Sequence, residues 1–191
     1  MECGRYGTIQ IRTFMIRAED YSPPLDRALE LIHTAKSSFV AVILCNPNSP
    51  TGQLVPRHQL LKFIDALTKM HVWTIVDESF IEFASEHSVL TELLTYPRLL
   101  VLRSFSKFYG LPVLRIGYLV GPSHIVERLR LCQPPWSVNA LAQRGQLRHL
   151  RILIITARVW LLSQRNVRAS VLHYGQSRGC ECSHPPRIFC C

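Results

Sequence analysis

The fold is decided by the stretch Ser104-Phe-Ser-Lys-Phe-Tyr-Gly-Leu-Pro-Val-Leu-Arg-Ile-Gly-Tyr118. It places Lys107 directly after two serine hydroxyls and eight residues before Arg115. An amine can form a Schiff base with an aldehyde, while hydroxyls and a guanidinium can hold a phosphate. Ser104, Ser106, Lys107 and Arg115 therefore predict a site for a phosphorylated aldehyde, namely pyridoxal phosphate (PLP).

Buried strands alternate with helices on both sides of this stretch. Continuous apolar runs predict strands at Phe39–Cys45, Val72–Val76 and Leu99–Leu102, with further strands at Gly7–Arg17 and Ile116–Val120. Apolar residues at helical spacing predict helices at Leu25–Ala35, from Pro56 onward, around Val89–Leu94 and at Ile125–Leu131. This alternation predicts an α/β fold with a largely parallel sheet.

Polar residues follow three of the predicted strands at the point where each strand ends. They form the segments Asn46–Gly52, Asp77–Ser79 and Ser104–Lys107. In open α/β sheets the ligand site lies beyond the carboxyl ends of the strands. The three segments are therefore expected to meet at one site.

Each of these residues also has an ordinary structural interpretation. Asp77 can cap the following helix or pair with the pyridine nitrogen of PLP. Asn48 lies in a turn rich in Pro, Asn and Gly, and its amide can also reach the phenolic oxygen of the cofactor. Lys107 and Arg115 can be solvated surface charges. The position of Lys107 after a buried strand favours a Schiff-base lysine, partly desolvated, and the fixed offset of Arg115 from Lys107 favours a phosphate clamp.

The positive charge is concentrated in the last part of the chain. The formal net charge is +9, but residues 1–143 carry 14 Lys and Arg against 12 Asp and Glu. The last 48 residues carry eight Arg and one acidic residue, Glu181. The main part of the chain therefore gives no indication of a nucleic-acid or membrane partner. A weaker alternative is that Leu147–Arg165 forms a basic amphipathic helix, which would bind nucleic acid or a membrane.

Cysteine usage and hydropathy favour a cytoplasmic protein. Cys3, Cys45 and Cys132 are scattered singly, as thiols in a reducing compartment usually are. The cysteines from Cys180 to Cys191 lack the spacing of a structural zinc site, so no metal is expected. There is no secretory signal, and the longest apolar stretch, Ile152–Leu162, is too short to span a membrane.

Three segments carry a resemblance to a known family: Asn46-Pro-Asn-Ser-Pro-Thr-Gly52, Val76-Asp-Glu-Ser-Phe-Ile-Glu-Phe83 and Arg103–Tyr118. In this order and spacing they resemble the class I/II aminotransferases of PLP fold type I. The resemblance implies part of a three-layer α/β/α large domain with a mainly parallel sheet. It also implies site residues: Lys107 as the catalytic lysine, with Asn48, Asp77, Phe80, Ser104, Ser106 and Arg115 as further cofactor-binding residues.

Within this family the chain looks most like the threonine-phosphate decarboxylases of cobalamin biosynthesis. The segment Gln133-Pro-Pro-Trp-Ser-Val-Asn-Ala-Leu-Ala142 is similar to one of theirs, and Phe80 stands where aminotransferases usually carry a tyrosine. The implied reaction converts O-phospho-threonine to aminopropanol phosphate. A histidinol-phosphate-type aminotransferase and an inactive fragment of either enzyme remain alternatives. Complete family members are homodimers, so a homodimer is the expected assembly.

The sequence also departs from the family pattern. Val113 stands where a glycine is usual, which would displace Arg115 if the backbone there needs a positive φ. The resemblance extends from about Gly7 to Gln143, which predicts a partial PLP-binding domain at residues 1–143 that lacks the family's N-terminal segment. Residues 144–191 are expected to be an arginine- and cysteine-rich tail of doubtful structure. Their composition is typical of an out-of-frame reading of a GC-rich gene, so we hypothesise a frameshift shortly after Ala142.

Overall fold

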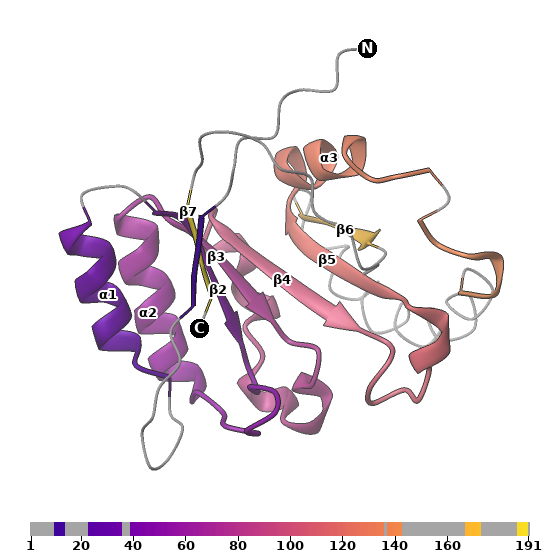
Figure 1. Cartoon of the computed structure of the whole chain (residues 1–191), viewed down its shortest axis with the longest axis horizontal. Helices are drawn as coiled ribbons and strands as arrows, with labels where there is room; N and C mark the ends of the chain where they lie inside the picture. The colour runs from indigo at the N-terminus through magenta and orange to yellow at the C-terminus, as the bar shows by residue number, and fades with distance from the viewer. Residues whose placement is uncertain are drawn as a thin grey trace.

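Figure 1 shows the computed structural model of the chain. The residues that it describes are 10–13, 23–35, 39–135, 137–142, 167–172 and 187–190. The alternative helix at Leu147–Arg165, the apolar stretch Ile152–Leu162 and most of the cysteine cluster lie outside these residues. In the described part of the chain, no helix combines the length and hydropathy that crossing a bilayer requires.

A single mixed sheet forms the centre of the fold. Among the described residues, seven strands pair in the order β1-β7-β2-β3-β4-β5-β6. All neighbours from β1 to β4 pair in parallel, whereas β5 is antiparallel to both β4 and β6. The strands are β1 (Gln10–Thr13), β2 (Phe39–Cys45), β3 (Trp73–Asp77), β4 (Leu99–Ser104), β5 (Gly117–Pro122), β6 (Val167–Leu172) and β7 (Arg187–Cys190).

Helices cover both faces of this sheet. Figure 1 shows α1 (Leu25–Thr34) and α2 (Arg57–Lys69) side by side, and α3 (Ser123–Leu131) next to β5. Along β4 the side chains alternate between two cores, because successive residues of a strand point to opposite faces. Leu99 and Val101 pack with residues of α2, whereas Leu100 packs with Val126 of α3. The predicted three-layer arrangement with a mainly parallel sheet is confirmed.

Most predicted elements are present at or near their expected bounds. The apolar run Phe39–Cys45 is β2 without any shift, and the helix predicted from Pro56 begins at Arg57. The helix expected around Val89–Leu94 is a 3-10 helix, η3 (Leu90–Leu94). Two shorter 3-10 helices precede it, η1 (Ile81–Phe83) and η2 (Ser85–His87), and a fourth, η4 (Pro112–Leu114), precedes β5.

Residues 144–191 were expected to have doubtful structure, and two short strands within this range, β6 and β7, pair with the sheet. Strand β6 pairs with β5 along its whole length, from Gly117 opposite Leu172 to Pro122 opposite Val167. Strand β7 lies between β1 and β2. The domain boundary at residue 143 stays a prediction.

A buried network of charges connects β3, β4 and the 3-10 helices. The guanidinium of Arg103 donates to Glu78 Oε2 at 2.8 Å, to Glu82 Oε1 at 2.9 Å and to Ser88 Oγ at 2.9 Å. The second oxygen of Glu78 accepts the main-chain N–H of Val89 at 2.7 Å. The side chains of Glu78 and Arg103 are only 1% and 12% exposed. Three separate segments are therefore held around one guanidinium.

Burial and charge act in opposite directions within this network. Burial raises the pKa of Glu78 above its ordinary value of 4.5, against the opposing effects of the Arg103 charge and of hydrogen bonds. Burial, the largest single effect, lowers the pKa of Arg103, but the charges of Glu78, Tyr118 and Glu82 together outweigh it, so the pKa of Arg103 is raised. Burial raises the pKa of the neighbouring Tyr118 to about 12. The charge of Arg103 is the largest of the effects that oppose this rise in the pKa of Glu78.

We expect Arg103→Met to lower the free energy of unfolding by about 3–5 kcal/mol near neutral pH, because it leaves Glu78 as an unpaired buried charge. The matched control is Arg27→Met, since Arg27 and Glu30 form an ion pair whose side chains are both 65% exposed. Urea unfolding of both variants measures the difference. An equal, small effect at both positions would contradict the assignment.

The same variant should show a characteristic pH dependence. With Arg103 removed, the pKa of Glu78 rises further above 4.5, so the folded state holds a proton that the unfolded state releases. The stability that Glu78 gains by holding this proton is complete below its pKa in the unfolded state, and it is lost as pH rises through its pKa in the folded state. The deficit of Arg103→Met relative to the parent should therefore shrink as pH falls toward 4.5. A deficit that does not change with pH would show that Glu78 is not its source.

Candidate active site

The three polar segments meet at one edge of the sheet. Cys45 at the end of β2 pairs with Asp77 at the end of β3, and Asp77 pairs with Leu102 near the end of β4. Because these strands are parallel, the residues that follow them leave the sheet on the same side. Asn46–Gly52, Ser79–Phe80 and Phe105–Lys107 begin from this edge.

Asp77 is half-buried, and hydrogen bonds hold its carboxylate. Its Oδ1 accepts the main-chain N–H of Ser79 at 2.9 Å and the hydroxyl of Ser79 at 2.5 Å. Its Oδ2 lies 3.9 Å from Cys45 Sγ. Asp77 faces the half-exposed side of β3, whereas Glu78 points to the opposite side and is completely buried. The alternation of side chains along a strand explains why adjacent acidic residues differ so much.

Lys107 and Phe80 are brought together from different elements. The Nζ atom of Lys107 lies 5.2 Å from the centroid of the Phe80 ring, within the range of a cation–π interaction. Lys107 was expected to be partly desolvated, but its side chain is exposed. The reason is local, since Phe105 supplies the buried side chain of this loop and Lys107 lies on the outer side. A second contact joins the same two segments, an edge-to-face pair of Phe83 and Phe108 with centroids 5.1 Å apart.

The two serines before the lysine form a pair. The hydroxyl oxygens of Ser104 and Ser106 lie 2.5 Å apart, and the main-chain N–H of Ser106 donates to Ser104 Oγ at 3.1 Å. Ser104 is the last residue of β4, so the strand fixes its position. Hydroxyls and main-chain N–H groups in this arrangement are of the kind that binds phosphate.

The structure corrects the expectation for Val113. Val113 lies in η4 and is 85% exposed, and the positive φ in this segment falls on Arg115, at 50°, and on Gly110, at 64°. A β-branched side chain is therefore tolerated at position 113. Arg115 itself is exposed, and its Nη1 donates to the carbonyl of Pro112 at 3.2 Å within its own turn. The structure thus joins Arg115 to η4, and its role as a phosphate clamp stays a prediction.

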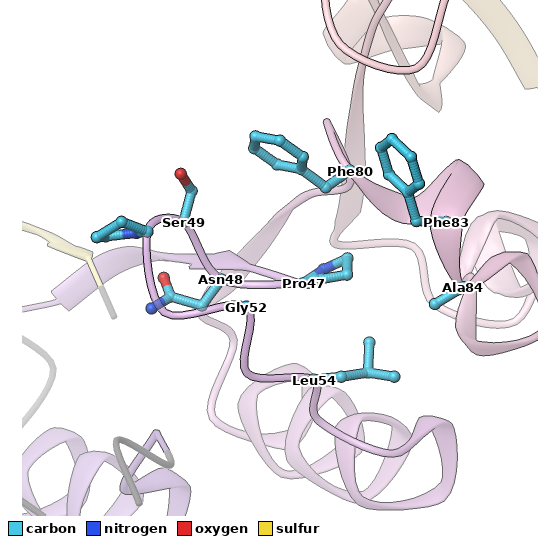
Figure 2. A pocket seen from close by; sticks show the side chains of 9 residues that line it. Pro47, Asn48, Ser49, Gly52, Leu54, Phe80, Phe83 and Ala84 are labelled. Atoms are coloured by element: carbon cyan, nitrogen blue, oxygen red, sulfur yellow. The ribbon is translucent and has the colours of Figure 1, made fainter.

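Asn48 and Phe80 line a pocket of about 350 Å³. Figure 2 shows the rings of Phe80 and Phe83 on one side of it and the loop with Asn48 and Ser49 on the other. The amide nitrogen of Asn48 donates to Thr51 Oγ1 at 2.7 Å, so the amide stabilises its own turn in this structure. The other lining residues are Pro47, Pro50, Gly52, Leu54 and Ala84, and none of the nine is charged.

Sequence reasoning did not single out Ser79 or the partners of Arg103. The contact of Arg103 with Glu78 did have a signal in the sequence. An acidic and a basic residue stand at the ends of neighbouring buried strands, and the strand register places them together. The segment Gln133–Ala142 also contacts the lysine region, since Asn139 donates to the carbonyl of Leu114 at 3.1 Å. Ala142 is buried with Phe105 and Ile116. In the described residues, no three His, Cys, Asp or Glu side chains converge as metal ligands would.

The donor set fits PLP. An amine, a carboxylate, a side-chain amide and paired hydroxyls lie at one edge of the sheet, and these are the groups that the aldehyde, ring nitrogen, phenolic oxygen and phosphate of PLP require. The chemistry of the donors, rather than any single distance, carries this match.

Comparisons with known proteins identify the family of the chain. The chain is 33% identical over 148 residues to a histidinol-phosphate aminotransferase from Thermoanaerobacter sp. (strain X514), covering 77% of this chain and 40% of that protein. The crystal structure of the histidinol-phosphate aminotransferase from Clostridium acetobutylicum superposes with a TM-score of 0.57 at 27% identity, covering 65% of this chain and 37% of that one. The L-threonine-O-3-phosphate decarboxylase from Porphyromonas gingivalis superposes with a TM-score of 0.51 at 33% identity, covering 57% and 34%.

The chain thus spans about 40% of the length of the curated relative it matches. A family model, described as aminotransferase class I and II, matches residues 2–156. This match is longer at both ends than the range from Gly7 to Gln143 that the motifs indicated. The chain therefore belongs to the class I and II aminotransferases, the PLP-dependent family that its lysine segment predicted.

Proposed function

We propose that this chain binds PLP covalently through Lys107 and takes part in decarboxylation of O-phospho-threonine to aminopropanol phosphate in cobalamin biosynthesis. The observation that carries this proposal is the position of Phe80. Its ring faces the ammonium of Lys107 at 5.2 Å and lines the pocket beside Asn48. By resemblance, the aminotransferases of the family usually have a tyrosine hydroxyl at this point.

Each site residue has a role in this proposal. Bound PLP supplies a ring that accepts electrons from the substrate. Asp77 would hold the ring nitrogen, and Asn48 would donate toward the phenolic oxygen. Lys107 would hold the aldehyde carbon, and its amine would carry the proton that replaces the departing carboxylate on the substrate Cα. The phosphate is held by Ser104, Ser106 and Arg115.

Phe80 favours decarboxylation because it brings an aromatic face but no hydroxyl. A tyrosine would donate a hydrogen bond to the cofactor oxygen and so alter the electron density near the reacting carbon. A phenylalanine leaves that oxygen to Asn48. The superposition with the Porphyromonas gingivalis decarboxylase, at 33% identity, supports this choice.

The second candidate is transamination of the histidinol-phosphate type. It is favoured by the curated relative that is 33% identical over 77% of this chain. Both candidates use a small phosphorylated amino compound, so the pocket chemistry alone does not separate them. We further propose a cytoplasmic location and a homodimer, with no nucleic acid or membrane as partner.

Mixing the purified chain with PLP should produce the visible absorption band of a lysine-bound cofactor, and Lys107→Ala should abolish it. The amine of Lys107 is the group that the band requires. Lys62→Ala is the matched control, because Lys62 is an exposed lysine on α2, outside the three site segments. A band that survives in Lys107→Ala, or its absence from the parent, would contradict the proposal.

Phe80→Tyr should shift the products from CO2 release toward amine transfer. The added hydroxyl restores the hydrogen bond that the family's aminotransferases make. The measurement compares CO2 and amino-group transfer from O-phospho-threonine in the parent and the variant. Phe83→Tyr is the control. Phe83 is exposed and lines the same pocket, whereas the ring over which the Lys107 ammonium lies is that of Phe80. An unchanged product ratio in Phe80→Tyr would remove the argument from Phe80.

A further inference from the structure

We propose that Ser79 is a positioning residue that orients the carboxylate of Asp77 toward the ring nitrogen of the cofactor. This inference rests on the proposed function, in which Asp77 holds that nitrogen. It assigns a role to a residue outside the predicted set of cofactor-binding side chains. Ser79 acts through Asp77 and does not itself contact the cofactor.

Two donors of Ser79 fix one carboxylate oxygen. The main-chain N–H lies 2.9 Å from Asp77 Oδ1 and the hydroxyl oxygen lies 2.5 Å from the same atom. Hydrogen bonds to a charged oxygen are stronger than those between neutral groups. Rotation of the carboxylate about its Cβ–Cγ bond would break both, so Oδ1 is held in place.

The backbone at Asp77 is fixed as well. The Asp77 carbonyl accepts the N–H of Asn46 at 2.9 Å, and the N–H of Glu78 donates to the Leu102 carbonyl at 2.9 Å. Asp77 is therefore held by hydrogen bonds to the strands on both sides. With the backbone and Oδ1 fixed, the position of Oδ2 is fixed as well.

The contact of Oδ2 with the thiol of Cys45 is compatible with that role. The distance of 3.9 Å is long even for a sulfur donor, and a thiol is a weak donor. A protonated ring nitrogen is a much stronger donor and would take precedence. Asp77 thus has one oxygen committed to Ser79 and one oxygen directed to the cofactor.

The hydroxyl is the part of this arrangement that depends on serine. Ser79→Ala keeps the main-chain N–H bond and removes the 2.5 Å hydroxyl bond. We expect it to weaken PLP binding about ten-fold, the usual size for losing one hydrogen bond to a charged group. Ser79→Thr keeps a hydroxyl and should restore binding, and Ser79→Cys, with its weaker donor, should fall between the parent and Ser79→Ala.

The experiment compares PLP with its analogue in which a CH group replaces the ring nitrogen. Dissociation constants of both compounds are measured by absorbance titration for the parent, the three variants and the control Ser85→Ala, an exposed serine on the same segment. The melting temperature of each protein without ligand checks folding. We expect graded affinity for PLP across the Ser79 series and equal affinity of all five proteins for the analogue.

Equal losses for PLP and the analogue would overturn the inference, because a merely structural role does not depend on the ring nitrogen. Unchanged PLP affinity in Ser79→Ala would overturn it too. If Ser79→Ala does not fold, the affinities of Ser79→Cys and Ser79→Thr for PLP and for the analogue are compared instead. Weaker binding of PLP alone by Ser79→Cys supports the inference, and equal binding of PLP by the two variants overturns it. A parent chain that binds neither compound would overturn the proposed function itself, and the inference with it.

Discussion

Glu78 and Arg103 are charged groups withdrawn from water with 2.8 Å between them, and the site is assembled around that contact. Removing either charge from water is costly unless the partner and further hydrogen bonds compensate for it. Ser88 and the main-chain N–H of Val89 supply those bonds. Arg103 directly precedes Ser104, so the interaction that neutralises Glu78 also fixes where the lysine segment leaves β4.

The same guanidinium of Arg103 also determines the position of Phe80. Glu82 lies in η1, two residues after Phe80, and accepts a hydrogen bond from Arg103 at 2.9 Å. Phe80 and Lys107 belong to segments that are distant in the sequence, but both segments are attached to Arg103 within a few residues. Their 5.2 Å contact is therefore a consequence of the buried network rather than of local sequence.

The sequence predicted what depends on local pattern and on register. The strand Phe39–Cys45 and the helix after Pro56 are determined by apolar periodicity, and the convergence of three polar segments follows from parallel pairing. The full set of partners of Arg103 was not predictable in this way: register places Glu78 beside it, but Glu82 lies in η1 and Ser88 directly follows η2, and strand pairing does not position these 3-10 helices. The left-handed backbone of Arg115 was also missed. The expectation placed the strain at Val113, where a glycine is usual, whereas η4 shifts the positive φ two residues further on.

The groups available for chemistry lie at the edge of the sheet, beside the pocket and on Lys107. The pocket beside Asn48 is lined by uncharged residues, so in the proposed reaction the positive charges that hold a phosphorylated substrate and cofactor come from the lysine segment. A ring face attracts the ammonium of Lys107 without offering a hydrogen-bond donor or acceptor in its plane. In the proposed reaction the proton on Lys107 is consequently not shared with residue 80 and stays available for the substrate Cα. Because the buried network positions the backbone of Phe80 independently of a hydroxyl on its ring, the effect proposed for Phe80→Tyr on the reaction does not require a change in the fold.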